Sequence, residues 1–218
     1  FLLGLAWVGG RLRSARRRLW NQPARIPWLV VALALLTFLG TSLIADGVLE
    51  RIPHVQDSVT YLFQAQTLAR GDLWAPAPPL PQAFEQEFLL VRDGRWFGKY
   101  PPGFPALLAI GVRLGAPWLV NPLLAALTVC LLFILGKTLY GARLGLLTAL
   151  LALVSPFFLF MSGSLMAHPA ELFWMALFAL AWLRALGLPR HSPRVHRPWA
   201  HTVLAGLALG MTFLTRQY

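Results

Sequence analysis

The feature that most restricts the fold of this chain is a series of apolar runs that contain no charged residue. The first run, Ile26–Ala45, matches the stretch of about 20 residues that an α-helix needs to cross the hydrocarbon core of a bilayer. Only 12% of the 218 residues are charged, whereas a soluble domain carries about 25%. The sequence therefore predicts an all-α polytopic membrane protein.

Further apolar runs predict further spans. They are Leu114–Gly136, Leu144–Ala167, Leu172–Leu183 and Pro198–Thr215. We expect the span in the first of these to begin at Asn121-Pro122, because Asn caps helices and Pro suits the first helical turn. Pro156 is expected to kink the next span. Gly206 and Gly210 have the spacing that lets two membrane helices approach closely. The prediction is about five transmembrane helices.

The charged residues separate into two groups along the chain. Three segments hold basic residues and no acid: 11–25, 137–143 and 184–201. Every acid lies in residues 46–117 or is Glu171. The positive-inside rule then places the Arg-rich segments in the cytoplasm and the loop 50–117 outside a plasma or inner membrane. This pattern also accounts for the net charge of +11 without a nucleic-acid partner.

The loop 50–117 is too long for a plain connection, and its sequence predicts a structured cap. Ser58–Arg70 has the pattern of an amphipathic helix, with Asp57 at its N-cap and Gly71 at its C-terminal stop. Its expected apolar face is Val59, Leu62, Phe63 and Ala69. EFLLVRDGRWFGKY predicts a β-hairpin that turns at Asp93-Gly94. YPPGFPALLAIGVRLGAPW predicts a second helix that lies on the membrane surface.

Asp57 is the first candidate for chemistry, and two interpretations remain open for it. Its carboxylate could cap the following helix, or it could act as a general base at the outer membrane boundary. His168 and Glu171 are three residues apart, which puts both on one face at the start of the fourth span. They are either a polar helix end or a second part of the same site.

Cationic residues of the outer loop are candidates for binding phosphate. We expect the hairpin to carry Arg95 and Lys99 back toward the membrane, beside Tyr100, and Arg51 is a further candidate. Contact with water or with lipid headgroups is the alternative for each. No nucleotide-binding loop or metalloprotease motif is present in the sequence. The sequence establishes no cofactor and leaves a divalent metal open.

Several motifs together resemble one class of membrane enzymes. They are DSVTYLFQAQTLARG after the first span, KYPPGFPALLA, an Asn-Pro-led span that closes with GKTLYG, and SGSLMAHPAELF. This layout resembles the GT-C class of membrane glycosyltransferases, and within it the protein O-mannosyltransferases and lipid A aminoarabinose transferases. The resemblance implies that residues 26–218 form the N-terminal part of a GT-C-like transmembrane domain. From the residues themselves, 1–25 are expected to be a cytoplasmic basic segment, and residues 1–10 could be the tail of an earlier span.

The resemblance also implies a reaction. A sugar would pass from a polyprenyl-phosphate carrier to a hydroxyl of a lipid, glycan or protein acceptor at the outer face, with inversion at the anomeric carbon. Asp57 would be the base, His168 a further polar site residue, and Lys99 and Arg95 the ligands of the carrier phosphate. Many members have Glu after the loop Asp, whereas this chain has Ser58.

Two other functions fit a polytopic chain. A transporter or flippase usually places ionisable groups near the middle of the membrane, but here the span centres lack charge. A non-catalytic assembly protein would not need Asp57. The sequence therefore favours the lipid-dependent glycosyltransferase.

Overall fold

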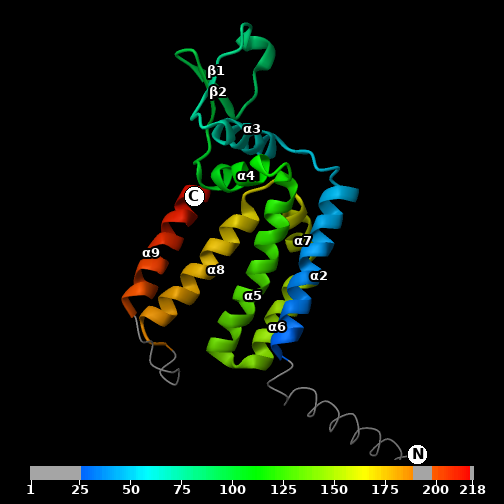
Figure 1. Ribbon diagram of the computed structural model, residues 1–218, viewed down its shortest axis with the longest axis vertical. Helices are drawn as coiled ribbons and strands as arrows, with labels where there is room; N and C mark the ends of the chain where they lie inside the picture. The colour runs from blue at the N-terminus through cyan, green and yellow to red at the C-terminus, as the bar shows by residue number, and fades with distance from the viewer. Residues whose placement is uncertain (1–25, 189–197, 217–218) are drawn as a thin grey trace, which may run out of the picture.

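A computed structural model describes residues 26–188 and 198–216, and this part of the chain contains eight α-helices and one small sheet. The predicted cytoplasmic segment 1–25 lies outside the described residues, as does part of segment 184–201. Most of the helices run side by side as a bundle, and the remaining short helices and the sheet cover one end of it (Figure 1). The predicted helical class is confirmed.

The bundle consists of α2 (Ile26–Gly47), α5 (Val120–Tyr140), α6 (Ala142–Leu153), α8 (His168–Ala185) and α9 (Pro198–Thr215). One buried cluster joins α2, α5, α6 and α7 (Pro156–Gly163) and comprises Val30, Ala125, Val129, Phe133, Ala149 and Phe158. Large apolar side chains also cover the outside of α2, where Leu35, Leu39 and Leu43 are more than half exposed. An apolar outer surface is what a helix presents to lipid.

The expectation of about five spans is not confirmed. Only Pro27–Gly47 and Pro117–Tyr140 of the described residues are long and apolar enough to cross a membrane as single helices. A third span results if α6 and α7 (Pro156–Gly163), which meet at a bend of 61°, count as one. The predicted break at Pro156 is confirmed, and Ser155 caps α7 by accepting a hydrogen bond from the Phe158 amide at 3.4 Å.

Asn121 does not cap α5, as the sequence had suggested. It lies one residue inside the helix and is buried. Its Nδ2 donates to the carbonyl oxygens of Ser164 and Met166, at 2.6 and 2.8 Å. Since a buried amide needs such partners, Asn121 fixes the turn that leads into α8.

Within the described residues, no close approach occurs at Gly206 and Gly210, because a Cβ at either position would meet nothing within 4 Å. Close contact occurs instead between α5 and α6. A Cβ at Gly145 would lie 2.6 Å from the Phe133 carbonyl oxygen, and one at Gly136 would lie 2.9 Å from the Gly145 Cα. These two glycines let the two antiparallel helices touch through their backbones.

The cap contains α3 (Gln56–Arg70), α4 (Gly103–Arg113) and a sheet of β1 (Ala75–Pro76), β2 (Leu89–Arg92) and β3 (Arg95–Gly98), in the order β1-β3-β2. Short 3₁₀ turns cover Pro81–Phe84 and Pro117–Leu119. Figure 1 shows α3 and α4 lying across the bundle end while the sheet projects away from it. The hairpin is confirmed, and Asp93 and Gly94 both have positive φ, at 51° and 71°, as a two-residue hairpin turn requires. Strand β1 was not predicted.

Helix α3 ends where predicted, at Gly71 with φ of 95°, and its expected apolar face is confirmed in part, because Leu62 and Ala69 pack against the buried cluster and Phe63 packs against Trp96. Val59 is 38% exposed, whereas Tyr61 and Ala65 are buried. The small hydroxyl residues Ser58, Thr60 and Thr67 are buried beside them. The reason is that α3 packs closely on β3 and α4, where short side chains fit better than branched apolar ones.

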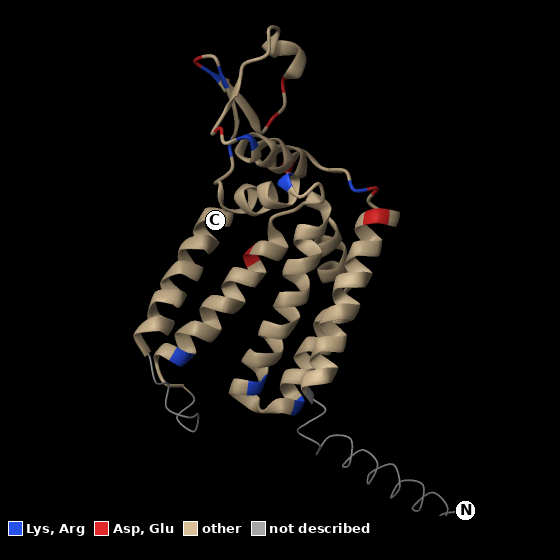
Figure 2. Cartoon of the chain, in the orientation of Figure 1, with Lys and Arg blue, Asp and Glu red and all other residues tan. Residues whose placement is uncertain are grey.

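The acidic residues of the described part lie toward one end of the molecule. Figure 2 shows them toward the end that carries the sheet, where Lys and Arg are present too, while the opposite end of the bundle shows only Lys and Arg. The sequence predicted this placement of the acids along the chain.

Candidate functional site

The first turn of α3 leaves the Asp57 carboxylate available for chemistry. The helix begins at Gln56 after the N-cap Val55, so Asp57 is its second residue and not its cap. The hydroxyl of Ser58 performs the capping. It accepts from the Val55 amide at 3.3 Å and donates to the Val55 carbonyl oxygen at 2.8 Å. The N-cap interpretation of Asp57 is therefore wrong.

The half-buried Asp57 carboxylate is held by Tyr100, whose hydroxyl donates a hydrogen bond to Oδ1. Tyr100 follows strand β3, and Gln64 of α3 fixes it by donating from Nε2 to its carbonyl oxygen at 2.9 Å. Its ring lies against those of Tyr61 and Phe88, with centroids 4.6 and 5.7 Å apart. The hairpin and α3 thus position one carboxylate together.

Glycine is required where β3 crosses α3. A Cβ at Gly98 would lie 2.5 Å from the Gln64 Cδ and 2.7 Å from the Thr60 Cγ2. Without a side chain at Gly98, the strand comes close enough for Gln64 to reach the Tyr100 backbone. The position of the Tyr100 hydroxyl therefore depends on this contact.

Both tyrosines beside Asp57 keep their protons at neutral pH. Burial, and then the negative charge of Asp57, raise the pKa of Tyr61 to about 12, while Arg216 acts in the opposite direction. Burial also raises the pKa of Tyr100, and the hydrogen bond to Asp57 raises it further. Tyr100 is therefore a donor to Asp57 throughout the physiological range.

Arg216 brings a cation to the same place from the far end of the described chain. It directly follows α9, and its guanidinium donates to Nε2 of His168, the first residue of α8, at 2.5 Å. The end of α9 packs under α4, where a Cβ at Gly103 would lie 2.5 Å from the Leu214 carbonyl oxygen. Since Nε2 accepts this hydrogen bond, the proton of the neutral imidazole is on Nδ1.

Asp57, Arg216 and His168 form one electrostatic cluster. Asp57 and Arg216 both act on the Tyr61 hydroxyl and on the His168 ring. Glu171 is one turn further along α8 and is only 6% exposed, so it lies deeper than His168. The structure thus joins a carboxylate from α3, a phenol from the β3–α4 connection, an imidazole from α8 and a guanidinium after α9.

The other cations that the sequence singled out lie in three different places. Lys99 is next to the cluster, with Nζ 3.3 Å from the Phe88 ring centroid and 5.2 Å from that of Tyr100. Arg95 pairs with Arg92 beside the hairpin turn, and its guanidinium covers the Trp74 ring at 4.3 Å. Arg95 therefore lies at the turn end of β3, whereas Lys99 lies just beyond the other end of that strand. Arg51 forms an exposed ion pair with Asp46 at 2.7 Å.

The chain matches the model of one protein family. This family is described as dolichyl-phosphate-mannose-protein mannosyltransferase, and the match covers residues 99–218, which is more than half of the chain. The chain belongs to this family. No curated protein and no solved structure matches it.

Membership in the mannosyltransferase family identifies a membrane-embedded glycosyltransferase that uses a lipid-linked sugar donor. The matched segment contains every residue of the site except Asp57, namely Tyr100, His168, Glu171 and Arg216, together with the neighbouring Lys99. Asp57 precedes the matched segment, so its place in the cluster is known from the structure alone.

Sequence reasoning missed Arg216 in this mannosyltransferase-family chain. The residue follows an apolar run and has no local motif, and only the packing of α9 under α4 reveals its neighbours. A single cation at the outer end of a predicted span was the one available signal. Among the described residues, no group of three or more His, Cys, Asp or Glu side chains could hold a metal ion.

Proposed function

We propose that this chain transfers a sugar from a polyprenyl-phosphate carrier to an acceptor hydroxyl at the membrane face that carries the small sheet, with Asp57 as the general base. The observation that carries the proposal is the state of the Asp57 carboxylate. It is not used to cap α3, it accepts a hydrogen bond from Tyr100, and its charge acts on His168, which Arg216 contacts.

The proposed reaction is a single displacement. Asp57 takes the proton of the acceptor hydroxyl as its oxygen attacks the anomeric carbon. The bond between this carbon and the phosphate oxygen breaks, and the polyprenyl phosphate leaves with both electrons of that bond. Attack from the side opposite the phosphate inverts the anomeric carbon. Because Tyr100 already holds one carboxylate oxygen, Oδ2 is the atom proposed to take the proton.

The leaving phosphate gains one negative charge in this step, so a cation that contacts it stabilises the transition state more than the bound donor. Arg216 is the proposed contact, since its guanidinium is planar, permanently charged and suited to two phosphate oxygens. Lys99, beside Tyr100, is the second candidate. Arg95 is left out because it lies beside the hairpin turn.

His168 and Glu171 are proposed to shape the sugar side of the site. His168 accepts from Arg216 and thereby fixes the guanidinium, while the buried Glu171 lies one turn deeper on α8. The acceptor is a hydroxyl of a lipid, glycan or protein. The absence of acidic residues from the opposite end of the described bundle in Figure 2 supports an outward-facing site, with that basic end in the cytoplasm.

The test is the substitution Asp57→Asn in the full-length protein, with transfer measured from polyprenyl-phosphate-linked sugar. Asn keeps the size of the side chain and can still accept from Tyr100, but it cannot take a proton. We expect the transfer rate to fall roughly 100-fold to 10,000-fold, as is typical for loss of a general base.

Asp93→Asn is the matched control, because Asp93 is exposed in the hairpin turn and Asn tolerates its positive φ. It should transfer at the wild-type rate. An Asp57→Asn protein that folds and still transfers sugar at the rate of the Asp93→Asn protein would remove the base role.

A further inference from the structure

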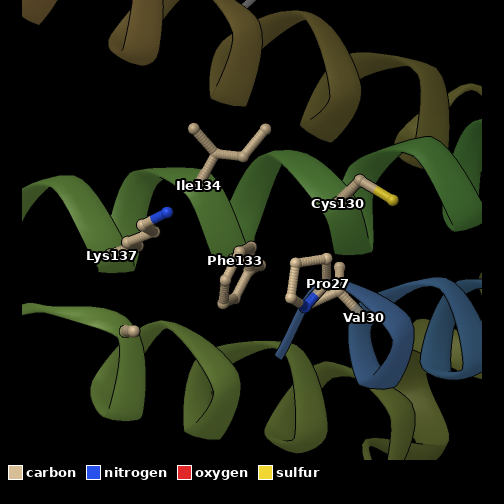
Figure 3. A pocket seen from close by; sticks show the side chains of 7 residues that line it. Pro27, Val30, Cys130, Phe133, Ile134 and Lys137 are labelled. Atoms are coloured by element: carbon tan, nitrogen blue, oxygen red, sulfur yellow. The ribbon is translucent and has the colours of Figure 1, made fainter. Parts of the chain in front are cut away.

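A groove lies at the end of the bundle opposite the proposed site. Its volume is about 370 Å³, within the range of small-molecule sites. Helices α2, α5 and α6 form its walls (Figure 3). The lining is Pro27, Val30, Cys130, Phe133, Ile134, Lys137 and Ala142. All of these except Lys137 are apolar or, in the case of Cys130, nearly so.

The groove runs along α5 from Cys130 to Lys137 (Figure 3). At 1.5 Å per residue, these two positions are about 10 Å apart along the helix. Lys137 is in the last turn of the span Pro117–Tyr140, so it lies where hydrocarbon gives way to headgroups. The groove thus extends from headgroup level into the apolar layer.

Lys137 has no acidic partner within the described residues. Its Nζ lies 5.9 Å from the Phe133 ring centroid, and no carboxylate of the described part is within ion-pair distance. The acidic residues of this part lie toward the other end of the molecule (Figure 2). Residues 1–25, which precede the groove in sequence, contain Arg and no acid, so they cannot neutralise Lys137.

We propose that this groove binds one anionic phospholipid, with an acyl chain along the apolar wall of α5 and the phosphate on Lys137. An apolar groove of this length suits part of an acyl chain, and a Lys at the membrane boundary suits a lipid phosphate. The close contact of Gly136 with Gly145 keeps α5 and α6 together, so one wall of the groove is rigid. The site is separate from the transfer reaction and holds a structural lipid.

The test is native mass spectrometry of the full-length protein with equal amounts of phosphatidylglycerol and phosphatidylcholine that carry the same acyl chains. We expect the wild type to retain phosphatidylglycerol preferentially. Lys137→Gln should reduce the preference about fivefold, since one basic residue near an anionic lipid changes the binding constant by about that factor. Lys137→Arg keeps the charge and should keep the preference. Arg184→Gln is the matched control, because Arg184 is in the last turn of α8 at the same end but does not line the groove.

Three results would overturn the proposal. An equal loss of preference in Lys137→Gln and Arg184→Gln would show that the charge of the whole surface selects the lipid. Ala142→Phe, which fills the groove, should lower retention of both lipids, and unchanged retention would show that no acyl chain lies there. A variant that begins at Ile26 and gains lipid would show instead that residues 1–25 occupy the groove.

Discussion

Tyr100 holds the carboxylate of Asp57 from across the proposed site, so its hydroxyl should matter for the rate more than for the fold. Tyr100→Phe keeps the ring contacts with Tyr61 and Phe88 but removes the donated hydrogen bond. A carboxylate without this donor samples more orientations. We expect the transfer rate to fall roughly tenfold, which corresponds to about 1.4 kcal/mol of barrier, with little change in the KM for the donor.

Tyr61→Phe is the control for this prediction. Tyr61 is buried beside Tyr100, and its hydroxyl makes no hydrogen bond to Asp57 in the described structure. The variant should transfer at nearly the wild-type rate. Equal losses in both variants would show that aromatic packing, and not the Tyr100 hydrogen bond, determines the rate.

Substitution of Arg216 should weaken binding of the carrier phosphate, whereas substitution of Arg95 should not. If Arg216 contacts the phosphate as proposed, Arg216→Gln should raise the KM for the lipid donor and lower kcat, because the cation stabilises both the bound phosphate and its developing charge. Arg216→Lys should recover part of the loss, since it keeps the charge without the planar fork. Steady-state kinetics with varied donor concentration measure both effects.

Arg95→Gln is the comparison. Arg95 is a cation of the cap, and its guanidinium covers the Trp74 ring. It should leave both kinetic constants unchanged. A large rise in the KM for the donor in Arg95→Gln, with Arg216→Gln unaffected, would restore the expectation drawn from the sequence.

At the scale of elements, the crossing of β3 over α3 should be sensitive to a single methyl group. Gly98→Ala places a Cβ within 2.7 Å of Gln64 and Thr60, so the strand or the helix must move. We expect the free energy of unfolding to fall by about 1–3 kcal/mol, as for other overpacked contacts. Transfer should also slow, because Tyr100 follows this strand directly.

Thermal unfolding of the purified protein measures the change. Gly40→Ala in α2 is the control, since a Cβ there would meet nothing within 4 Å, and Ala favours a helix over Gly by about 0.5–1 kcal/mol. A Gly98→Ala protein as stable as the Gly40→Ala protein would show that β3 and α3 do not pack this closely.

Local signals in the sequence were sufficient for several elements and insufficient for others. The hairpin turn at Asp93-Gly94, the stop of α3 at Gly71 and the break at Pro156 each depend on one or two residues, and all three are present. The sequence left Asp57 open between an N-cap and a general base, because Asp is among the preferred N-cap residues. The helix begins one residue earlier, with Ser58 hydrogen-bonded to Val55, and Asp57 accepts from Tyr100 instead.

At the scale of the whole molecule, the proposed site depends on segments that are distant in sequence. Asp57 follows the first span, whereas His168 and Arg216 lie at the two ends of the α8–α9 pair. Packing of α9 beside α8 and under α4 brings them together, and no periodicity in the chain reports that packing. The sequence could therefore indicate Asp57 and His168 as candidates but could not indicate Arg216.

The most direct test of the account is a structure of the full-length protein with polyprenyl phosphate bound. The account predicts that the phosphate contacts the Arg216 guanidinium, with His168 beside it and the Asp57 carboxylate facing the space that the sugar leaves. A phosphate bound at the hairpin next to Arg95, or an Asp57 side chain that points to bulk water away from Arg216, would contradict it.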